Sequence, residues 1–566
     1  MNAMSIFSIT RPLGLLMLVM STMACAIIGS QSAYTASAAA LMQVGPDDDP
    51  AQDAPTCSIY VHASYQGSSN GSAARPWKRI REALAKARPG DTICLEGVFA
   101  ERIIPASSGT PERYITIRSR YVNNRATLNL KGVSVPEGDQ GAVHIINQSY
   151  IRIKNLNITG YTTNTLTSSP TGIFVRSEAD MQVTGIHLIG NHIYSLGNSH
   201  GTTFSSSELE ACGKTPVASC LNEDLKWNIS GFGIVVKGRS TSPINDVLIH
   251  GNELNNLTTG ASESLVINGN VDGWTVSHNL IHDNNNIGID AIGYEDADMF
   301  PENFDQELNR ARNGNILGNR VWNISSDGNP SYANYIGNGK VHDYDRSADG
   351  IYVDGGTHNV IDGNLIINTN IGIELAAEAN YRTTDYNIVR NNIIAKVDYA
   401  ALLLGGYSEE QGEEGGHDGG GSSTNNIVVN NTAYTLTPDS LACAEQFRVS
   451  ANIIANNICA ATARNELQID MSDNTAASNL AVTLTNKQPN PAKLFVSVSL
   501  PTGNQLRNWS SSAIQQFLHI TAGSAAHNTG TMSIAGQAVN AGATDIDGQP
   551  RMNGSAIDIG ADERTP

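Results

Sequence analysis

The sequence predicts an all-β protein folded as one parallel β-helix, a solenoid of short stacked strands. Its strongest indication is an eight-residue frame with aliphatic residues at the second and fourth positions, as in "GIYVDGG" from Gly350 and "GIELAAE" from Gly372. Turn signals of the type "GNxI" separate many copies, and the repeat recurs about every 20 to 30 residues. Long stretches of 3.6-residue periodicity are absent, which excludes a helical solenoid.

The N-terminus has the layout of a secretory signal peptide, predicted over residues 1–38. Arg11 precedes an apolar run, and the small residues Ala36-Ser37-Ala38 form a cleavage site before a linker at 39–56. We expect a secreted or periplasmic protein, or alternatively a lipoprotein anchored through Cys25. No other run is long and apolar enough to span a membrane.

The β-helix is predicted over residues 57–495, with a helix near its start. The segment "PWKRIREALAKARPGD", residues 76–91, is amphipathic and predicts a helix that caps the open N-terminal end of the coil. Residues 496–566 are predicted to form a C-terminal cap or appendage, in which the "DIDG" from Asp545 indicates a turn.

Ten copies of the frame define the rungs, and the asparagines between them predict stacked structural turns. The frames begin at Ala142, Gly172, Gly233, Ser264, Gly288, Gly350, Gly372, Ala401, Gln446 and Glu466. The turn asparagines are Asn191, Asn252, Asn279, Asn319, Asn364, Asn392, Asn431 and Asn457.

Outside the signal segment the cysteines are even in number, which predicts disulfides in an exported chain. Sequence proximity suggests the pairs Cys57 with Cys94, Cys212 with Cys220 and Cys443 with Cys459, although spacing leaves other connectivities open.

The entry segment "PGDTICLEGVFAER" and the Gly/Asn repeats resemble the pectate-lyase-type right-handed parallel β-helix superfamily, over roughly residues 57–480. The "ADG" at Ala348–Gly350 is similar to an aspartate-rich segment of polysaccharide lyase family 9, whose members use Ca²⁺ and a lysine base. Because this fold hosts many activities, the resemblance implies the fold more firmly than the function.

Polar residues on the outward side of the middle rungs are the candidate site. The third and fifth frame positions are expected to face solvent, and the longest insertion lies beside them, at 294–349. A solvated solenoid surface is the plain alternative. The candidate catalytic residues are Asp290, Tyr352, Asp354, Glu374 and Lys237; the candidate substrate-binding residues are Arg176, Tyr294, Glu295, His342, Glu378 and Tyr407; and the candidate Ca²⁺ ligands are Asp345, Asp349 and Asp354.

Three functions fit these features. The first is a Ca²⁺-dependent lyase that cleaves an acidic polysaccharide by β-elimination, although Lys237 is the last lysine in either outward column. The second is a glycoside hydrolase with paired carboxylates, and the third is a non-catalytic glycan-binding or adhesion protein. The net charge of -19 argues against nucleic acid as a partner. We expect a monomer that acts on a polysaccharide without spanning a membrane.

Overall fold

A computed structural model of the chain describes residues 56–198, 228–336, 340–406, 421–435, 437, 440–445, 448–461, 473–483 and 491–564. The predicted signal peptide, Cys25, the pair Cys212 and Cys220, Tyr407 and the frame from Glu466 lie outside these residues. No described helix has the length and apolar composition needed to cross a membrane.

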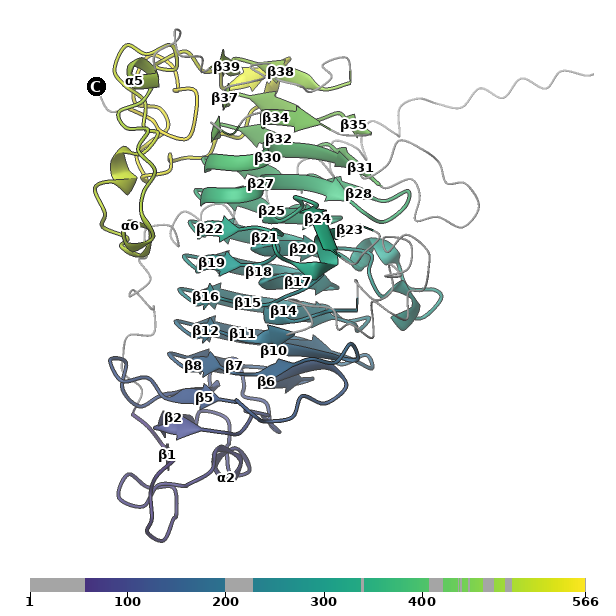
Figure 1. Ribbon diagram of the computed structural model, residues 1–566, viewed down its shortest axis with the longest axis vertical. Helices are drawn as coiled ribbons and strands as arrows, with labels where there is room; N and C mark the ends of the chain where they lie inside the picture. Colours follow the sequence, from purple (N-terminus) through teal and green to yellow (C-terminus); the bar gives the residue numbers. More distant parts are fainter. Residues whose placement is uncertain are drawn as a thin grey trace, which may run out of the picture.

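The described strands stack into a parallel β-helix, and Figure 1 shows the rungs rising in sequence order from β1 to β39. Its right-handed sense is the one expected when parallel strands are joined by crossover connections. One sheet of the coil consists of β1 (Ile59–His62), β2 (Thr92–Glu96), β4 (Ile115–Ser119), β7 (Ile151–Lys154), β11 (Val183–Ile189), β15 (Ile244–His250), β18 (Val271–Ser277), β21 (Ala311–Leu317), β26 (Val360–Asp362), β29 (Ile388–Arg390), β32 (Ile427–Val429), β36 (Ile453–Ala455) and β38 (Thr475–Ala477).

A second set of strands forms two ladders that merge in the long strands β27 (Leu365–Ala377) and β30 (Ile393–Gly406). The first ladder, here called the flank ladder, also contains β3 (Val98–Phe99), β5 (Thr127–Asn129), β8 (Asn157–Thr159), β12 (His192–Tyr194), β16 (Glu253–Asn255), β19 (Leu280–Asn284), β22 (Arg320–Ile324), β33 (Thr432–Thr435), β37 (Ile458–Ala461) and β39 (Leu480–Thr483). The second, the site ladder, also contains β6 (Gly138–Ile146), β10 (Ser168–Ser177), β14 (Phe232–Gly238), β17 (Leu265–Gly269), β20 (Ile289–Ile292), β25 (Asp349–Asp354) and β34 (Leu441–Glu445).

Short elements decorate the coil. The remaining strands are β9 (Thr162–Thr163), β13 (Gly197–Asn198), the hairpin β23 (Ala333–Ile336) and β24 (Lys340–Tyr344), β28 (Thr383–Asp385), β31 (Ser422–Thr424), β35 (Val449–Ser450), β40 (Ser533–Ile534) and β41 (Gln537–Ala538). The helices are α2 (Ile80–Leu84), α5 (Pro491–Leu494) and α6 (Gly503–Arg507), with 3-10 turns at Ala297–Met299, Gln306–Leu308, Pro330–Tyr332 and Ile514–Gln516.

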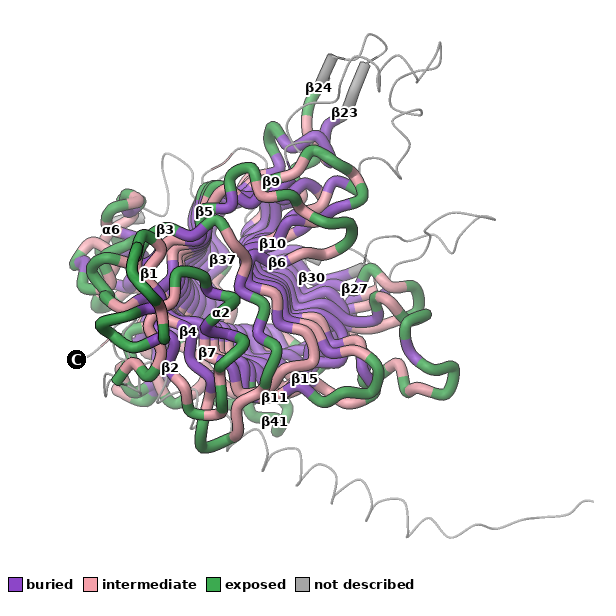
Figure 2. The backbone as a smooth tube through the Cα atoms, turned by 90° about the horizontal axis from the view of Figure 1, so that it is seen from below, coloured by how far each residue is buried: buried purple, intermediate pink, exposed green. Residues whose placement is uncertain are grey.

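The interior of the coil is filled by the aliphatic residues of the frame, as the alternation predicts. Ile351 and Val353 of β25 and Ile373 and Leu375 of β27 are almost fully buried in the main core. Figure 2, which looks along the stack, shows these buried strands superimposed along the axis. The fold prediction is therefore confirmed by the side chains that define it.

Two details of the predicted coil are wrong. The helix predicted over residues 76–91 shrinks to α2, because Trp77 exchanges backbone hydrogen bonds with Tyr60 and His62 and is held in an extended bridge. The frame from Gln446 is also misplaced in the column. Leu403 pairs with Ala444, whereas Arg448 precedes β35, which pairs with β31 outside the site ladder.

The turn asparagines form a continuous buried ladder along the coil. Each side-chain amide donates to the next side-chain oxygen at 2.9–3.0 Å, from Asn191 through to Asn479. All eight asparagines named from the sequence belong to this ladder. Their structural role is therefore confirmed.

Residues after 490 turn back and pack along the flank ladder (Figure 1). Phe495, Phe517 and Ile559 share a core with Trp322 and Leu365, whose side chains point away from the interior of the coil. Arg320 donates to the Leu506 carbonyl oxygen at 2.7 Å, across the same junction. The C-terminal segment thus covers the side of the solenoid over several rungs.

Two of the expected disulfides are present in the described residues. Cys57 is bonded to Cys94, and Cys443 is bonded to Cys459. The first ties Cys57, two residues before β1, to β2 at the N-terminal end of the coil. The second joins neighbouring strands β34 and β37.

Candidate functional site

The site ladder stacks one outward column as the sequence predicts. Val266 pairs with Asp290, Asp290 with Tyr352, and Tyr352 with Glu374, before the column returns to an aliphatic residue at Leu403. Asp354 lies two residues beyond Tyr352 on β25 and therefore points to the same side of the sheet. Asp349, three residues before Tyr352, departs from this alternation, because its side chain meets that of Glu374 on the same side.

The prediction that this side faces solvent is wrong. Asp290, Asp349 and Glu374 are only 1–2% exposed, and Asp354 is 7% exposed. Below them, Phe174, Val235, Val266 and Ile292 form an apolar cluster separate from the core of the coil. Side chains alternate in direction whether or not anything covers them, so alternation alone does not predict exposure.

Burial raises the pKa of these four buried carboxyl groups, and the neighbouring carboxylates add to the effect. The pKa of Glu374 rises to about 8, and those of Asp290, Asp349 and Asp354 rise well above the usual range. Glu263, which precedes β17 and is half-buried, belongs to the same group, with a pKa raised to about 8. We call Glu263, Asp290, Asp349, Asp354, Glu374 and Glu378 the carboxyl cluster.

Within the cluster, Asp349 and Glu374 form a carboxyl–carboxylate hydrogen bond between neighbouring rungs. Such a pair shares a proton, because two adjacent carboxylates do not both ionise at low cost. Tyr352, which pairs with Glu374, packs against Ile287 and Ala376 and is itself almost fully buried. The inner carboxyl groups therefore keep protons at neutral pH, and they lie beside apolar side chains.

Asp290 has a buried oxygen, Oδ1, without a hydrogen-bond partner among the described residues. A buried carboxylate oxygen that is left unpaired is costly, and native proteins usually satisfy it with a donor, water or a metal ion. Carboxylate oxygens are the preferred ligands of Ca²⁺. The donor set of this cluster therefore fits a divalent cation.

The outer end of the cluster reaches solvent at Glu378, which follows β27. Its backbone N–H donates to Asp354 Oδ1 at 2.8 Å, so the two residues are in direct contact. The residue as a whole is exposed. Desolvation of its carboxyl group, together with the nearby Glu295 carboxylate, raises the pKa of that group to about 7. Among the cluster members, Glu378 thus combines solvent access with a pKa near neutrality.

Lys237 lies at the edge of the cluster and is already paired. Its Nζ is 2.7 Å from Asp296 and 3.8 Å from Glu295, an exposed residue that also accepts a hydrogen bond from Asn268. None of the ion pairs formed between described residues includes a member of the carboxyl cluster. The cluster therefore carries an excess of acidic groups over nearby cations.

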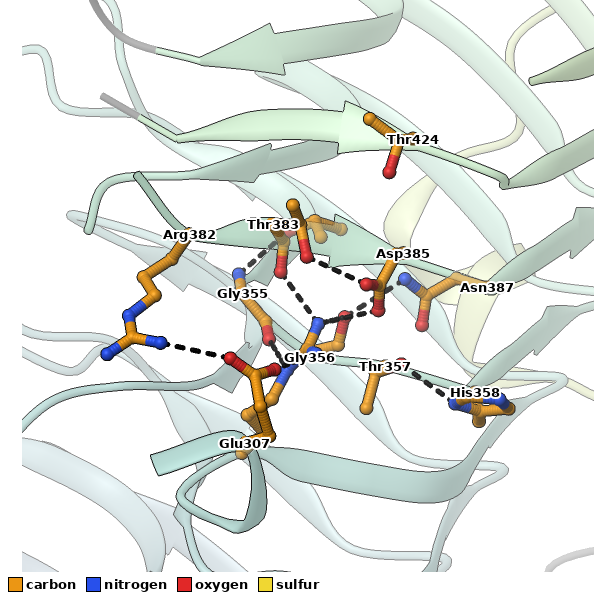
Figure 3. A network of polar contacts seen from close by, with 12 residues as sticks. Glu307, Gly355, Gly356, Thr357, His358, Arg382, Thr383, Asp385, Asn387 and Thr424 are labelled. Carbon is orange, nitrogen blue, oxygen red and sulfur yellow. Dashed lines mark hydrogen bonds and ion pairs between the residues drawn. The ribbon is translucent and has the colours of Figure 1, made fainter. Parts of the chain in front are cut away.

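Tyr294 does not join the cluster. It is 8% exposed, its hydroxyl donates to Glu307 at 2.8 Å, and the guanidinium groups of Arg310 and Arg382 lie over its ring. Glu307 is ion-paired with Arg310 and Arg382, and Arg310 also pairs with Asp385 of β28. Figure 3 shows Glu307, Arg382 and Asp385 in this network. These ion pairs connect the inserted segment at 294–349 to the turn and strand that follow β27.

The other predicted residues are dispersed. Arg176 is on the same side of the ladder but next to Lys237, and it pairs with Glu178. Asp345 is exposed just after β24, with its backbone bonded to Tyr332 and Ser326. The side chain of His342 lies outside the described part of the structure.

Sequence reasoning missed Glu263. Glu263 and Asp349 both occupy the position immediately before a frame, three residues before its third position, so strict alternation assigns this position to the interior. The alternation therefore gave no signal for Glu263, and the structure places both residues in the carboxyl cluster.

Comparisons with known proteins do not assign this chain to a family. No family model matches the chain. An uncharacterized Bacillus subtilis protein, YwoF, is 28% identical over 356 residues, which are 62% of this chain and 64% of YwoF. This chain thus spans less than two thirds of the length of that relative.

Among solved structures, pectate lyase Pel9A is 13% identical, with a TM-score of 0.43, and the match covers 89% of this chain and 96% of that chain. The GH136 lacto-N-biosidase from Eubacterium ramulus is also 13% identical, with a TM-score of 0.47 and coverages of 75% and 68%. At these values the comparisons assign neither a substrate nor a site to this chain. The parallel β-helix is established by this chain's own strand pairing.

Proposed function

We propose that this protein is an exported carbohydrate-active enzyme that cleaves a polysaccharide at the carboxyl cluster. The observation that carries this proposal is the solvent-exposed Glu378, whose pKa of about 7 makes it a competent proton donor at neutral pH. Its backbone contact with Asp354 places a second carboxyl group beside it. Paired carboxyl groups are the usual equipment for glycosidic bond hydrolysis.

In this proposal Glu378 protonates the leaving oxygen, and Asp354 acts on the sugar as base or nucleophile after losing its proton, because its raised pKa makes the carboxylate the less populated form at neutral pH. Asp354 is the most exposed of the strand carboxyl groups and accepts the Glu378 N–H through one oxygen, Oδ1. The inner groups, Asp290, Asp349 and Glu374, keep protons nearby and set the electrostatic potential. Hydrolysis requires no lysine base, which suits a cluster whose nearest lysine is already ion-paired.

A Ca²⁺-dependent lyase is the second candidate, and the unpartnered Asp290 Oδ1 favours it. Asp290, Asp349 and Glu374 would hold the cation, which would neutralise the carboxylate of a uronate substrate when bound. Proton abstraction would then require Lys237 to leave Asp296, or Tyr352 to ionise.

A substrate screen distinguishes these candidates. Purified protein is incubated with uronate polymers and with neutral glycans, with and without a chelator, while unsaturated products and reducing ends are followed separately. Reducing ends without unsaturation, insensitive to the chelator, support the hydrolase. Unsaturated products that vanish with the chelator support the lyase. Binding without turnover on a broad panel would contradict both and favour an adhesion protein.

A further inference from the structure

The C-terminal segment contains a second group of convergent ligand atoms, far in sequence from the carboxyl cluster. His519, Asp547 and Asp562 each present one ligand atom, and these atoms lie within 4.8 Å of one another. His519 and Asp562 are buried, while Asp547 is partly exposed. These residues come from three separate parts of a segment that has little regular secondary structure.

The other acids of this segment are already used by the backbone. Asp545 accepts from the N–H groups of Gln549 and Glu563, and Asp558 accepts from those of Asn528 and Arg564. These bonds explain why the sequence indicates a turn here. They leave Asp547 and Asp562 as the acids that converge on the His519 ring.

Each of the three residues is oriented by a hydrogen bond from an atom that does not face the site. The Phe517 carbonyl oxygen only accepts, so His519 Nδ1, at 3.1 Å, must donate to it, which leaves Nε2 as the metal-facing nitrogen. Asp562 Oδ2 accepts from the Ile520 N–H at 2.8 Å, which leaves Oδ1 for the site. Asp547 is held at its backbone, whose N–H donates to Asp545.

His519 Nε2 and Asp547 Oδ2 are 2.7 Å apart, a distance that either a shared proton or, after the two atoms move slightly apart, a bound metal ion would explain. A proton on the imidazole would satisfy Asp547 alone. Asp562 Oδ1 lies 3.9 Å from the same nitrogen and would gain little from it. A metal ion at about 2.0 to 2.2 Å from each ligand would satisfy all three after a small adjustment.

There is room for further ligands beside this group. A cavity of about 300 Å³ lies between the C-terminal segment and the flank of the coil, and His519 and Asp547 line it. Its other walls include His278, Arg320, Gly363 and Trp509. Water molecules or a small ligand in this cavity would complete the coordination of a three-residue site.

We propose that His519, Asp547 and Asp562 bind a divalent transition-metal ion such as Zn²⁺ at the junction of the C-terminal segment and the coil. An imidazole ligand with two carboxylates suits Zn²⁺ and its neighbours better than Ca²⁺ or Mg²⁺. The ion would join three loops that otherwise meet only through hydrogen bonds and the apolar core of the flank. This inference does not rest on the proposed enzymatic function.

Isothermal titration calorimetry of Zn²⁺ into the full-length, chelator-treated protein tests the proposal. The variant Glu374→Gln serves as background, so that the carboxyl cluster contributes less to the signal. We expect one tight site per chain, lost in His519→Gln and weakened at least tenfold in Asp547→Asn. The matched control His527→Gln, in the same segment, should bind as the parent does.

Asp547 is partly exposed, so the variant Asp547→Asn should fold. If His519→Gln fails to fold, the Zn²⁺ affinity of Asp547→Asn tests the proposal by itself. Co²⁺ in place of Zn²⁺ adds a visible spectrum that should change in Asp547→Asn and not in His527→Gln. A parent protein that binds no Zn²⁺, or equal affinity in the parent and Asp547→Asn, would overturn the proposal and leave an ordinary histidine–aspartate ion pair.

Discussion

At the scale of single residues, environment separates carboxyl groups that look alike in the sequence. Glu374 is buried on the site ladder and hydrogen-bonded to Asp349, whereas Glu378 is four residues further along and exposed. Both pKa values are raised, mainly by desolvation, but only Glu378 has solvent access. Proton transfer to a polymer needs both properties in one group.

The variant Glu378→Gln tests this assignment on whichever glycan the screen identifies. Loss of the acid should lower kcat by about 10² to 10⁴-fold, the usual contribution of general acid catalysis. A substrate with an activated leaving group should recover much of the rate, because it needs little protonation. In the parent, activity should fall as pH rises through about 7, where Glu378 loses its proton.

Glu302→Gln, an exposed acid in the inserted segment, is the matched control and should keep parental kinetics. Parental kcat in Glu378→Gln, on a substrate that the parent cleaves, would remove Glu378 from the mechanism.

At the scale of elements, the asparagine ladder holds each rung at its turn. Asn364 donates to Asn392 Oδ1 and to the Ile316 carbonyl oxygen, and it accepts from the side chain of Asn319. Every one of these groups is buried, so its hydrogen bond has no replacement from water. The ladder thereby links the turn of each rung to the turns of its neighbours and fixes their alignment along the coil axis.

Replacing one rung of the ladder should therefore be costly. We expect Asn364→Ala to lower the free energy of unfolding by about 2 to 4 kcal/mol, because buried partners lose their bonds on both sides. Asn479→Ala, at the last described and only half-buried position of the ladder, should cost about 1 kcal/mol. Urea unfolding measures both, and an equal cost at the two positions would contradict a cooperative ladder.

At the scale of the whole molecule, two features distinguish this protein from a uniform repeating coil: the C-terminal segment that covers the flank ladder, and the carboxyl cluster on the site ladder. The C-terminal segment places apolar residues such as Phe517 against outward-facing Trp322 and Leu365. The carboxyl cluster places many protonatable groups in one region of the coil. Each feature makes a separate prediction about stability.

Phe517→Ala should loosen the cover while leaving the coil intact. The side chain is fully buried, and truncating such a phenylalanine typically costs about 3 to 5 kcal/mol. Hydrogen exchange should accelerate in residues 491–564 and change little in β15, β18 and β21, which lie on another sheet. Uniform acceleration across the coil would show instead that the segment and the solenoid unfold as one unit.

Stability should also fall with rising pH when divalent cations are absent. The pKa values of Glu263 and Glu374 are raised to about 8 and that of Glu378 to about 7, so the folded state holds these protons more tightly than the unfolded chain does. Their contribution is complete below about pH 4 and is lost between about pH 5 and 8. Tm measured in chelator should decline over that range.

Glu374→Gln isolates the part of this decline that comes from the cluster, because Asp545 and Glu563 in the C-terminal segment have raised pKa values as well. The variant should show a shallower decline than the parent. A Tm that stays level from pH 5 to 8 in the parent would contradict the raised pKa values.

The sequence by itself determined the coil, the order of its rungs and the asparagine ladder. These features repeat, and the two-residue alternation of a strand is a local property of the backbone that persists in any packing. For the same reason, the sequence alone predicts that Asp290, Tyr352 and Glu374 stand in one column. At Arg448 the predicted register is wrong, because a break in the repeat removes the local signal.

Only the tertiary structure decided which outward residues are buried, which carboxyl groups share protons, and where the C-terminal segment lies. Burial depends on segments that cover a strand from elsewhere in the chain, and no periodicity within the strand encodes them. The pKa of Glu378 and the meeting of His519 with Asp562 depend in the same way on distances between residues remote in sequence. Desolvation and charge coupling act through space, so they appear only once the chain has folded.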